Sequence, residues 1–180
     1  MVATAHDRTL GGQQFDQVLF EHLQEVFSKQ YSLDIAGNKK AQLRLARATE
    51  KAKKVLTTNP EASVSVECIM NDVDVRGRVA REEFEAMCAP LLDRVLVPVQ
   101  ACLEAAGMTA DDLFAAELVG GASRVRAVKE MLREQFGEKF GQHLNASESV
   151  AKGYAGFVVA VDLVLELMDG YFEMRLAVLW

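Results

Sequence analysis

The sequence AAELVGGASRVRAVKEMLREQF, at residues 115–136, is typical of a buried strand that turns at glycines into a helix. Its apolar run Ala115–Val119 ends at Gly120-Gly121, and apolar side chains then recur at helical spacing until Gly137 ends the helix. The residues on that helical face are Val125, Val128, Leu132 and Phe136. Because α/β domains are built from strands followed by helices, this pattern predicts an α/β fold class.

The same order of strand, glycine pair and helix occurs near the amino terminus. Residues 2–10 can end a strand, Gly11-Gly12 follows, and a helix with one apolar face begins at Phe15. A second helix is expected from the N-cap residue Asn38 to Asn59-Pro60. Alternating residues at 63–79 predict a hairpin, and residues 81–107 predict one long helix or two abutting ones, which adds α+β character.

The composition excludes several classes of protein. Twenty Lys and Arg against 26 Asp and Glu give the 180 residues a net charge of −6, which argues against bulk binding to nucleic acid or to an anionic membrane. Charged residues interrupt the apolar segment 154–180, so we expect no transmembrane helix. Three cysteines without metal-ligand spacing, and an amino terminus without a secretory signal, indicate a reducing compartment.

Two features could carry chemistry, and the residues alone leave each open. The glycine turns at Gly11-Gly12 and Gly120-Gly121 are either plain tight turns or places where the backbone approaches a phosphate or nucleotide. On the second helix, a carboxylate, two ammonium groups and a hydroxyl share one face, which is either solvated or a nucleoside site. These residues are Glu50, Lys53, Lys54 and Thr57. No catalytic constellation and no metal site is expected.

Several colinear segments then resemble the ATPase domain of heat shock protein 70 chaperones, over about Ala3 to Ala155. They keep the family's order and spacing. Residues 66–74 and 145–148 are most similar to the heat shock protein 110 branch, whose members act as nucleotide-exchange factors and holdases. The segments are His6-Asp7-Arg8-Thr9-Leu10-Gly11-Gly12-Gln13-Gln14-Phe15-Asp16, Arg44-Leu45, residues 50–57, Arg81-Glu82-Glu83-Phe84-Glu85, Leu118-Val119-Gly120-Gly121-Ala122-Ser123-Arg124 and Asn145-Ala146-Ser147-Glu148-Ser149-Val150-Ala151.

The resemblance implies an actin-like ATPase domain fragment that is most of the second lobe. Residues 1–12 would end an inner-lobe strand at the glycine turn. Residues 13–106 would form an outer helical subdomain with a hairpin, and residues 107–156 part of the inner α/β subdomain with the Gly-Gly nucleotide turn. Residues 157–180 are unlike the family continuation, and we expect them to be a divergent apolar tail.

The resemblance also implies an adenosine pocket and a function. Its residues would be Gly12, Glu50, Lys53, Lys54, Thr57, Gly120, Gly121, Ala122 and Arg124. The cofactor would be ATP or ADP, with Mg²⁺ implied by the family although its ligands would lie outside this chain. The chain is expected to bind adenine nucleotide without hydrolysing ATP, because the phosphate loops and the catalytic lysine would precede Met1. Ser147 stands where most heat shock protein 70 members have aspartate, Ala122 where many have serine, and Arg126 where most have proline.

The partners and location follow from the same resemblance. A cytoplasmic molecular chaperone of this kind assists protein folding in the stress response and exchanges nucleotide for a heat shock protein 70 partner. Unfolded clients would bind only through domains outside this chain, and neither nucleic acid nor membrane is an expected partner. The alternative is a nucleotide-independent interaction module that docks a partner chaperone.

The last residues predict a different property. Residues 163–180 are mainly apolar, and the sequence offers no evident segment to bury them. We therefore expect an altered or truncated ending that exposes apolar surface and promotes association.

Overall fold

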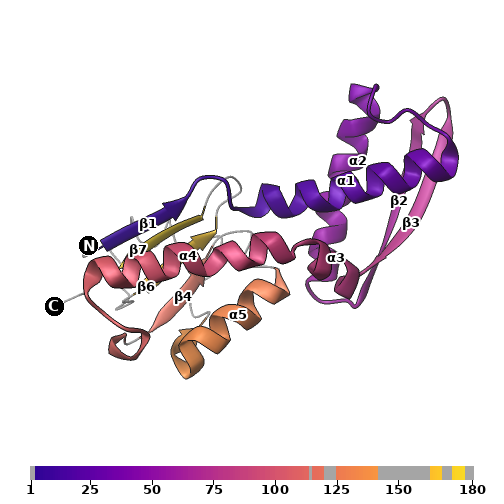
Figure 1. The fold of residues 1–180 in the computed structure, drawn as a ribbon. Coiled ribbons are helices and arrows are strands. Elements are labelled where there is room, and N and C mark those ends of the chain that lie inside the picture. The colour runs from indigo at the N-terminus through magenta and orange to yellow at the C-terminus, as the bar shows by residue number, and fades with distance from the viewer. Residues whose placement is uncertain (1–2, 114, 120–124, 142–162, 168–171, 177–180) are drawn as a thin grey trace, which may run out of the picture. The chain divides into compact units, whose positions relative to one another are not determined.

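The computed structural model describes residues 3–113, 115–119, 125–141, 163–167 and 172–176. Its chain divides into two compact units. The first comprises residues 1–14 and 90–180, and the second comprises residues 15–89. Each unit contains its own sheet, so the arrangement of each can be followed separately in Figure 1.

The first unit is built on a five-stranded sheet in the order β1-β7-β6-β4-β5. Strand β4 is parallel to β5 and to β6, whereas β7 is antiparallel to β6 and to β1. The sheet therefore places two strands, β7 and β6, between β4 and β1, the first strand of the chain. Its strands are β1 (Ala3–Asp7), β4 (Ala116–Val119), β5 (Phe140–Gly141), β6 (Leu163–Leu167) and β7 (Phe172–Leu176).

Two α-helices accompany this sheet, α4 (Ala89–Ala106) and α5 (Arg126–Phe136). Helix α5 buries Val128, Leu132 and Phe136, and it ends at Gly137, whose φ of 57° favours glycine. The 3₁₀ turns are η1 (Ala110–Asp112), which begins with a capping box at Thr109, and η3 (Gly137–Lys139). No single helix in the described ranges is long and apolar enough to cross a membrane, although α4 and the short helix before it pass that test together as a bent pair.

The second unit consists of helices and a two-stranded sheet. Its elements are α1 (Gly12–Tyr31, whose first residues belong to the first unit), α2 (Lys39–Leu56), β2 (Glu61–Met70), β3 (Val73–Ala80) and α3 (Arg81–Met87). Apolar residues of α1, α2 and the strands form a core that includes Phe15, Leu19, Phe27, Leu45, Val64 and Val75. The Asn38 side chain accepts hydrogen bonds from the backbone N–H groups of Lys40 and Ala41, so α2 begins where the sequence predicts.

The hairpin β2–β3 turns at Asn71 and Asp72, which both have positive φ. Asparagine and aspartate tolerate this conformation better than most residues, as a two-residue hairpin turn requires. Gly77 of β3 is needed for packing, because a Cβ atom there would lie 2.7 Å from the Phe27 ring. The hairpin can therefore approach α1 closely only with glycine at this position.

The structure confirms the elements that local sequence patterns predict. Helices α1, α2 and α5, strands β1 and β4 and the hairpin all occur, and residues 81–106 form two abutting helices that break at Cys88. The mixture of helices and small sheets agrees with the predicted α/β class with α+β character. The outer subdomain at residues 13–106 remains a prediction. In the division into compact units, residues 90–106 belong to the first unit.

The expectation for the end of the chain was wrong in one respect. Residues 163–167 and 172–176 are paired as strands β6 and β7, and they occupy the sheet positions between β1 and β4. Segments from residues 3–7 and 116–119 therefore supply the partners that the sequence did not reveal. A strand's partner is set by tertiary structure, which the apolar composition of the tail could not indicate.

A chain that ends at Gly156 should aggregate more and melt at a lower temperature than the full chain, because it lacks the two strands between β1 and β4. Light scattering and thermal unfolding measure this, with a chain ending at Leu176 as the control that keeps both strands. Equal scattering and equal melting temperatures for the Gly156 chain and the full chain would contradict this sheet.

Candidate functional site

The charged face of α2 separates into an exposed pair and a buried one. Lys54 lies on the surface, and its ammonium group is 2.6 Å from a Glu50 carboxylate oxygen one turn earlier. Lys53 instead buries its side chain, which is 9% exposed, and its ammonium group is 2.6 Å from Asp16 Oδ2 on α1. The alternative of a solvated helix face therefore holds for Glu50 and Lys54, but Lys53 is buried.

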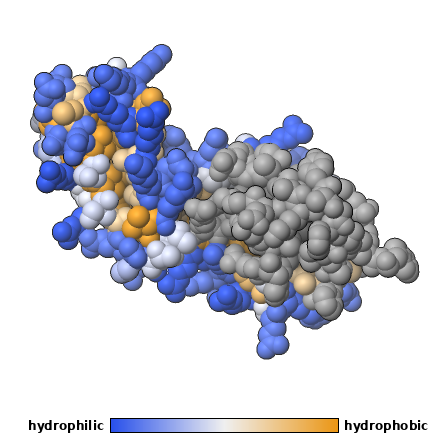
Figure 2. Space-filling model, turned by 180° about the vertical axis from the view of Figure 1, so that it is seen from behind, coloured by the Kyte–Doolittle hydropathy of each residue, from blue (hydrophilic) through white to orange (hydrophobic). Residues whose placement is uncertain are grey.

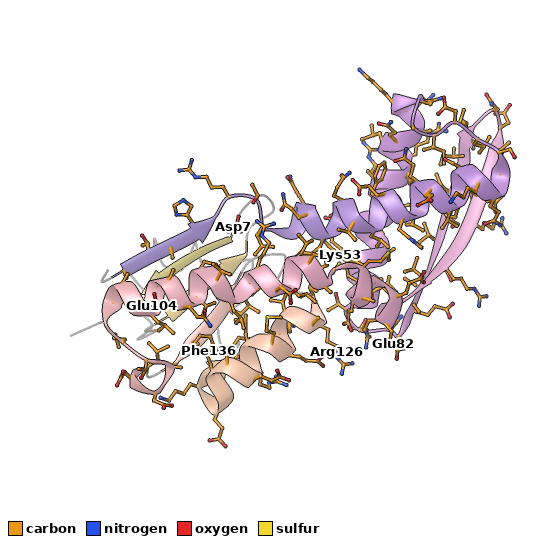
Figure 3. The ribbon with its side chains drawn as sticks, in the orientation of Figure 1. Asp7, Lys53, Glu82, Glu104, Arg126 and Phe136 are labelled. Atoms are coloured by element: carbon orange, nitrogen blue, oxygen red, sulfur yellow. The ribbon has the colours of Figure 1, made fainter. Side chains whose placement is uncertain are left out.

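The Lys53–Asp16 pair fixes a lysine at the place where α1 and α2 meet. Figure 3 shows Lys53 next to α1. An ammonium group that leaves water loses solvation, and a carboxylate at hydrogen-bonding distance compensates for the loss. Lys53 is therefore held in one position, whereas Lys54 remains on the surface.

The remaining two residues of this face have weaker constraints. Lys54 lowers the pKa of the Glu50 carboxyl from its ordinary value by hydrogen bonding and by charge. Glu50 therefore stays ionised at neutral pH and can accept hydrogen bonds from a ligand. The Thr57 hydroxyl lies 3.4 Å from the Lys53 carbonyl oxygen, at the end of α2. Glu50, Lys54 and Thr57 thus provide exposed or half-buried polar groups beside the buried lysine.

In the first unit, the turn before Gly12 is held by an aspartate and an arginine. Asp7 accepts hydrogen bonds from the backbone N–H and the hydroxyl of Thr9, at 2.8 and 2.9 Å. Arg94 of α4 donates to both Asp7 and Thr9, at 2.5 and 2.6 Å. Figure 3 shows Asp7 where β1 leads into this turn. The loop that leads to Gly11-Gly12 is therefore tied to α4.

These contacts change the acidity of Asp7. Burial by itself would raise the pKa of this carboxyl, but the donors on Thr9 and Arg94 outweigh it and the pKa is lowered. Asp7 is consequently ionised at neutral pH, as a stable ion pair with Arg94 requires.

The second glycine turn lies outside the described residues. Four residues of the predicted pocket fall there, namely Gly120, Gly121, Ala122 and Arg124. The structure describes the elements on either side, which are strand β4 up to Val119 and helix α5 from Arg126. The predicted strand and the predicted helix are therefore present on either side of these residues.

Sequence reasoning missed three residues near the predicted site. Asp16 and Arg94 are contacts of Lys53 and Asp7 across 37 and 87 positions of the chain, and no local pattern links such distant residues. The third is Gln14, whose buried Oε1 has no hydrogen-bond partner within the part of the chain that the structure describes. Gln14 lies in the first turn of α1, and its backbone N–H donates to the carbonyl of Gly11.

Metal and thiol chemistry receive little support from the described residues. Within them, no three His, Cys, Asp or Glu side chains are grouped so that they could hold a metal ion. Cys88 is buried, and desolvation with the nearby charge of Glu85 raises the pKa of its thiol to about 12. Its thiol therefore stays protonated and packs as a core group.

Comparison with known proteins identifies the family. Residues 1–163 match the family model described as Hsp70 protein. The chain belongs to this family, and the similarity to the heat shock protein 110 branch is confirmed. A fold of helices and small sheets is consistent with a fragment of the actin-like ATPase domain of the family.

Three relatives illustrate the match. The chain is 46% identical over 156 residues to human heat shock 70 kDa protein 4, and 44% identical over 155 residues to heat shock 70 kDa protein 14 of Arabidopsis thaliana, each covering 86% of the chain. It is 42% identical over 167 residues, 93% of the chain, to heat shock protein hsp88 of Neurospora crassa. The matched part spans only 19%, 19% and 24% of these relatives, respectively.

The neighbouring lysines provide a matched test of the buried pair. Lys53→Met should destabilise the protein by about 3 kcal/mol, because it leaves the Asp16 carboxylate partly buried without its cation. Lys54→Met should cost less than about 1 kcal/mol, since its partner is exposed. Denaturant unfolding measures both. Combining Lys53→Met with Asp16→Leu should recover much of the loss, and equal effects of the two lysine substitutions would contradict the assigned burial.

The turn before Gly12 makes a prediction about acidity. Arg94→Met should raise the pKa of Asp7 towards its ordinary value of 3.8. Because the folded-state pKa is lowered, the contacts of Asp7 stabilise the protein above pH 3.8 and this contribution is lost as the pH falls through the lowered value. Titration by NMR of the side-chain carboxyl signals gives the pKa directly. Asp112, held by Thr109, is the internal control, and an unchanged Asp7 would show that Arg94 does not act on it.

Proposed function

We propose that this chain is most of the second lobe of the nucleotide-binding domain of a heat shock protein 110/70-like chaperone. In this proposal it supplies the adenosine half of an adenine-nucleotide site. The observation that carries the proposal is that the family match at residues 1–163 includes the charged face of α2 and both glycine turns. Family membership favours this function over a nucleotide-independent docking module.

The described face of α2 supports nucleoside binding in three ways. The ionised Glu50 carboxylate is suited to accept hydrogen bonds from ribose hydroxyls. The side chain of Lys53 is held by Asp16, so binding a ligand would cost little additional side-chain conformational entropy there. Lys54 and Thr57 supply a further cation and a hydroxyl on the same face.

The glycine turns would complete the site. In the proposal Gly12 lies near the ribose, at a turn that Asp7 and Arg94 hold in place. Gly120, Gly121, Ala122 and Arg124 would close the other side of the pocket. Gln14 is an additional candidate, because its unsatisfied buried oxygen could accept a hydrogen bond from a ligand hydroxyl.

The fit to the rest of the cofactor is poorer. ATP or ADP would bring phosphates and Mg²⁺, and the described residues contain no grouped acidic side chains for the metal. Within the described ranges, the donor set therefore fits a nucleoside and does not fit the metal. For this reason we derive no hydrolytic step, and we propose that the chain alone does not hydrolyse ATP.

The wider biology is proposed at the level of the whole protein. A longer protein that includes this segment would act as a cytoplasmic chaperone in the stress response, would exchange nucleotide for a heat shock protein 70 partner and would bind unfolded clients through other domains. The segment would contribute its nucleotide site to that work.

Adenosine should bind weakly, and Glu50→Ala should weaken it at least about tenfold, because the ribose loses a charged hydrogen-bond acceptor. Titration calorimetry measures this for adenosine and for ADP, with Lys51→Ala as the control on a different side of α2. Adenosine and ADP should bind with similar constants. Affinity unaffected by Glu50→Ala, or far tighter binding of ADP than of adenosine, would contradict the proposed half-site.

A further inference from the structure

Helix α2 has a charge opposite to that of the rest of the chain. It contains seven of the 20 basic residues and one of the 26 acidic residues, so the remainder holds 13 basic against 25 acidic residues. The helix thus has a formal charge of +6 within a chain of net charge −6. Such separation creates a local positive field that the overall charge conceals.

Most of this charge lies along one stripe of the helix. Lys40, Arg44, Arg47 and Lys51 follow each other at spacings of four, three and four residues, which aligns them on one face. The buried residues of α2 lie on the opposite face; they are Ala41, Leu45, Thr49, Ala52, Lys53 and Leu56. We call Lys40, Leu43, Arg44, Arg47 and Lys51 the basic stripe.

The charges of the basic stripe are not neutralised within the described part of the chain. Lys40, Arg47 and Lys51 are exposed, and no acidic side chain there forms a salt bridge with any of them. Arg44 donates to the backbone carbonyls of Cys68 and Ile69, which hold its guanidinium group in place without cancelling its charge. The stripe therefore presents a row of cations, one of which is anchored.

An apolar side chain interrupts the row of cations. Leu43 is 56% exposed, which makes it one of the few large hydrophobic residues on the described surface. In the view of Figure 2, hydrophilic residues cover much of the described surface, with apolar patches between them. Leu43 lies beside Arg44 and Arg47, and arginine is enriched at protein interfaces, so this part of α2 offers a partner both apolar and charged contacts.

From this distribution we infer that the basic stripe docks an acidic peptide segment that carries an apolar side chain. Carboxylates of the segment would pair with Lys40, Arg47 and Lys51, and its apolar residue would cover Leu43. A nucleic acid is a poorer partner, because the rest of the chain is strongly acidic and would repel a long polyanion. The inference does not depend on nucleotide binding, since Lys40, Arg47 and Lys51 are not among the residues proposed to hold the nucleoside, although Glu50 and Lys54 adjoin the stripe.

A labelled peptide of alternating Glu and Leu tests the inference by fluorescence anisotropy with the full chain. The double variant Arg47→Glu with Lys51→Glu should weaken binding at least about tenfold, because two attractive pairs become repulsive. The matched control is Lys29→Glu with Arg78→Glu, which changes the charge of the same unit equally at exposed positions outside the stripe. This control variant should bind the peptide as tightly as the unaltered chain does. Higher salt should weaken peptide binding by the control variant and by the unaltered chain.

Three results would overturn the inference. If both double variants lose affinity equally, the peptide responds to net charge and not to the stripe. If single-stranded DNA of equal charge binds more tightly than the peptide and is lost with the stripe, the partner is a nucleic acid. If the unaltered chain does not bind the peptide at low salt, the stripe is a solvated face. Circular dichroism establishes that each variant is folded, and unchanged adenosine binding in the stripe variant separates this test from that of the proposed nucleotide site.

Discussion

The buried ion pair between Lys53 and Asp16 links α1 to α2 in the second unit. It places a cation inside the junction of α1 and α2, where it persists only while the carboxylate of Asp16 remains beside it. The hairpin packs against α2, so an α2 that rotated about its axis would lose both the pair and that packing. The same rotation would move Glu50, Lys54 and Thr57, so the position of the proposed nucleoside face depends on both the ion pair and the hairpin packing. Two neighbouring lysines thereby acquire different roles, one fixed between helices and one on the surface.

Local sequence patterns predicted the elements well because their causes are local. Asn38 caps α2 and Gly137 ends α5, as the sequence predicts. The candidate face of α2 was also predictable, since helical spacing alone puts its residues together. Local patterns could not predict which lysine is buried. That outcome depends on Asp16, which is 37 positions away and becomes a neighbour only when α1 packs on α2.

The sheet of the first unit shows the same limit at a larger scale. The apolar end of the chain was expected to remain without a partner, yet β6 and β7 lie between β1 and β4. Apolar composition indicated that residues 163–176 need burial, but the choice of partner depends on distant strands. Ala116 of β4 is 47 positions before its partner Leu163, and Asp7 of β1 is 165 positions before its partner Phe172. The contact of Arg94 with Asp7 is similarly distant, and it secures the turn after β1. Of the residues predicted to surround the nucleoside, Lys53 and the turn before Gly12 are therefore held by contacts that the motifs do not contain.

We propose that the charged face of α2 and the two glycine turns contribute to one adenosine site. The most direct measurement is a titration of isotope-labelled full chain with adenosine, followed by NMR of the backbone amides. We expect the largest shifts at Gly12, at residues 50–57 and at residues 120–124, all with one binding constant. Shifts confined to other residues, or different constants for α2 and for the glycine turns, would contradict it.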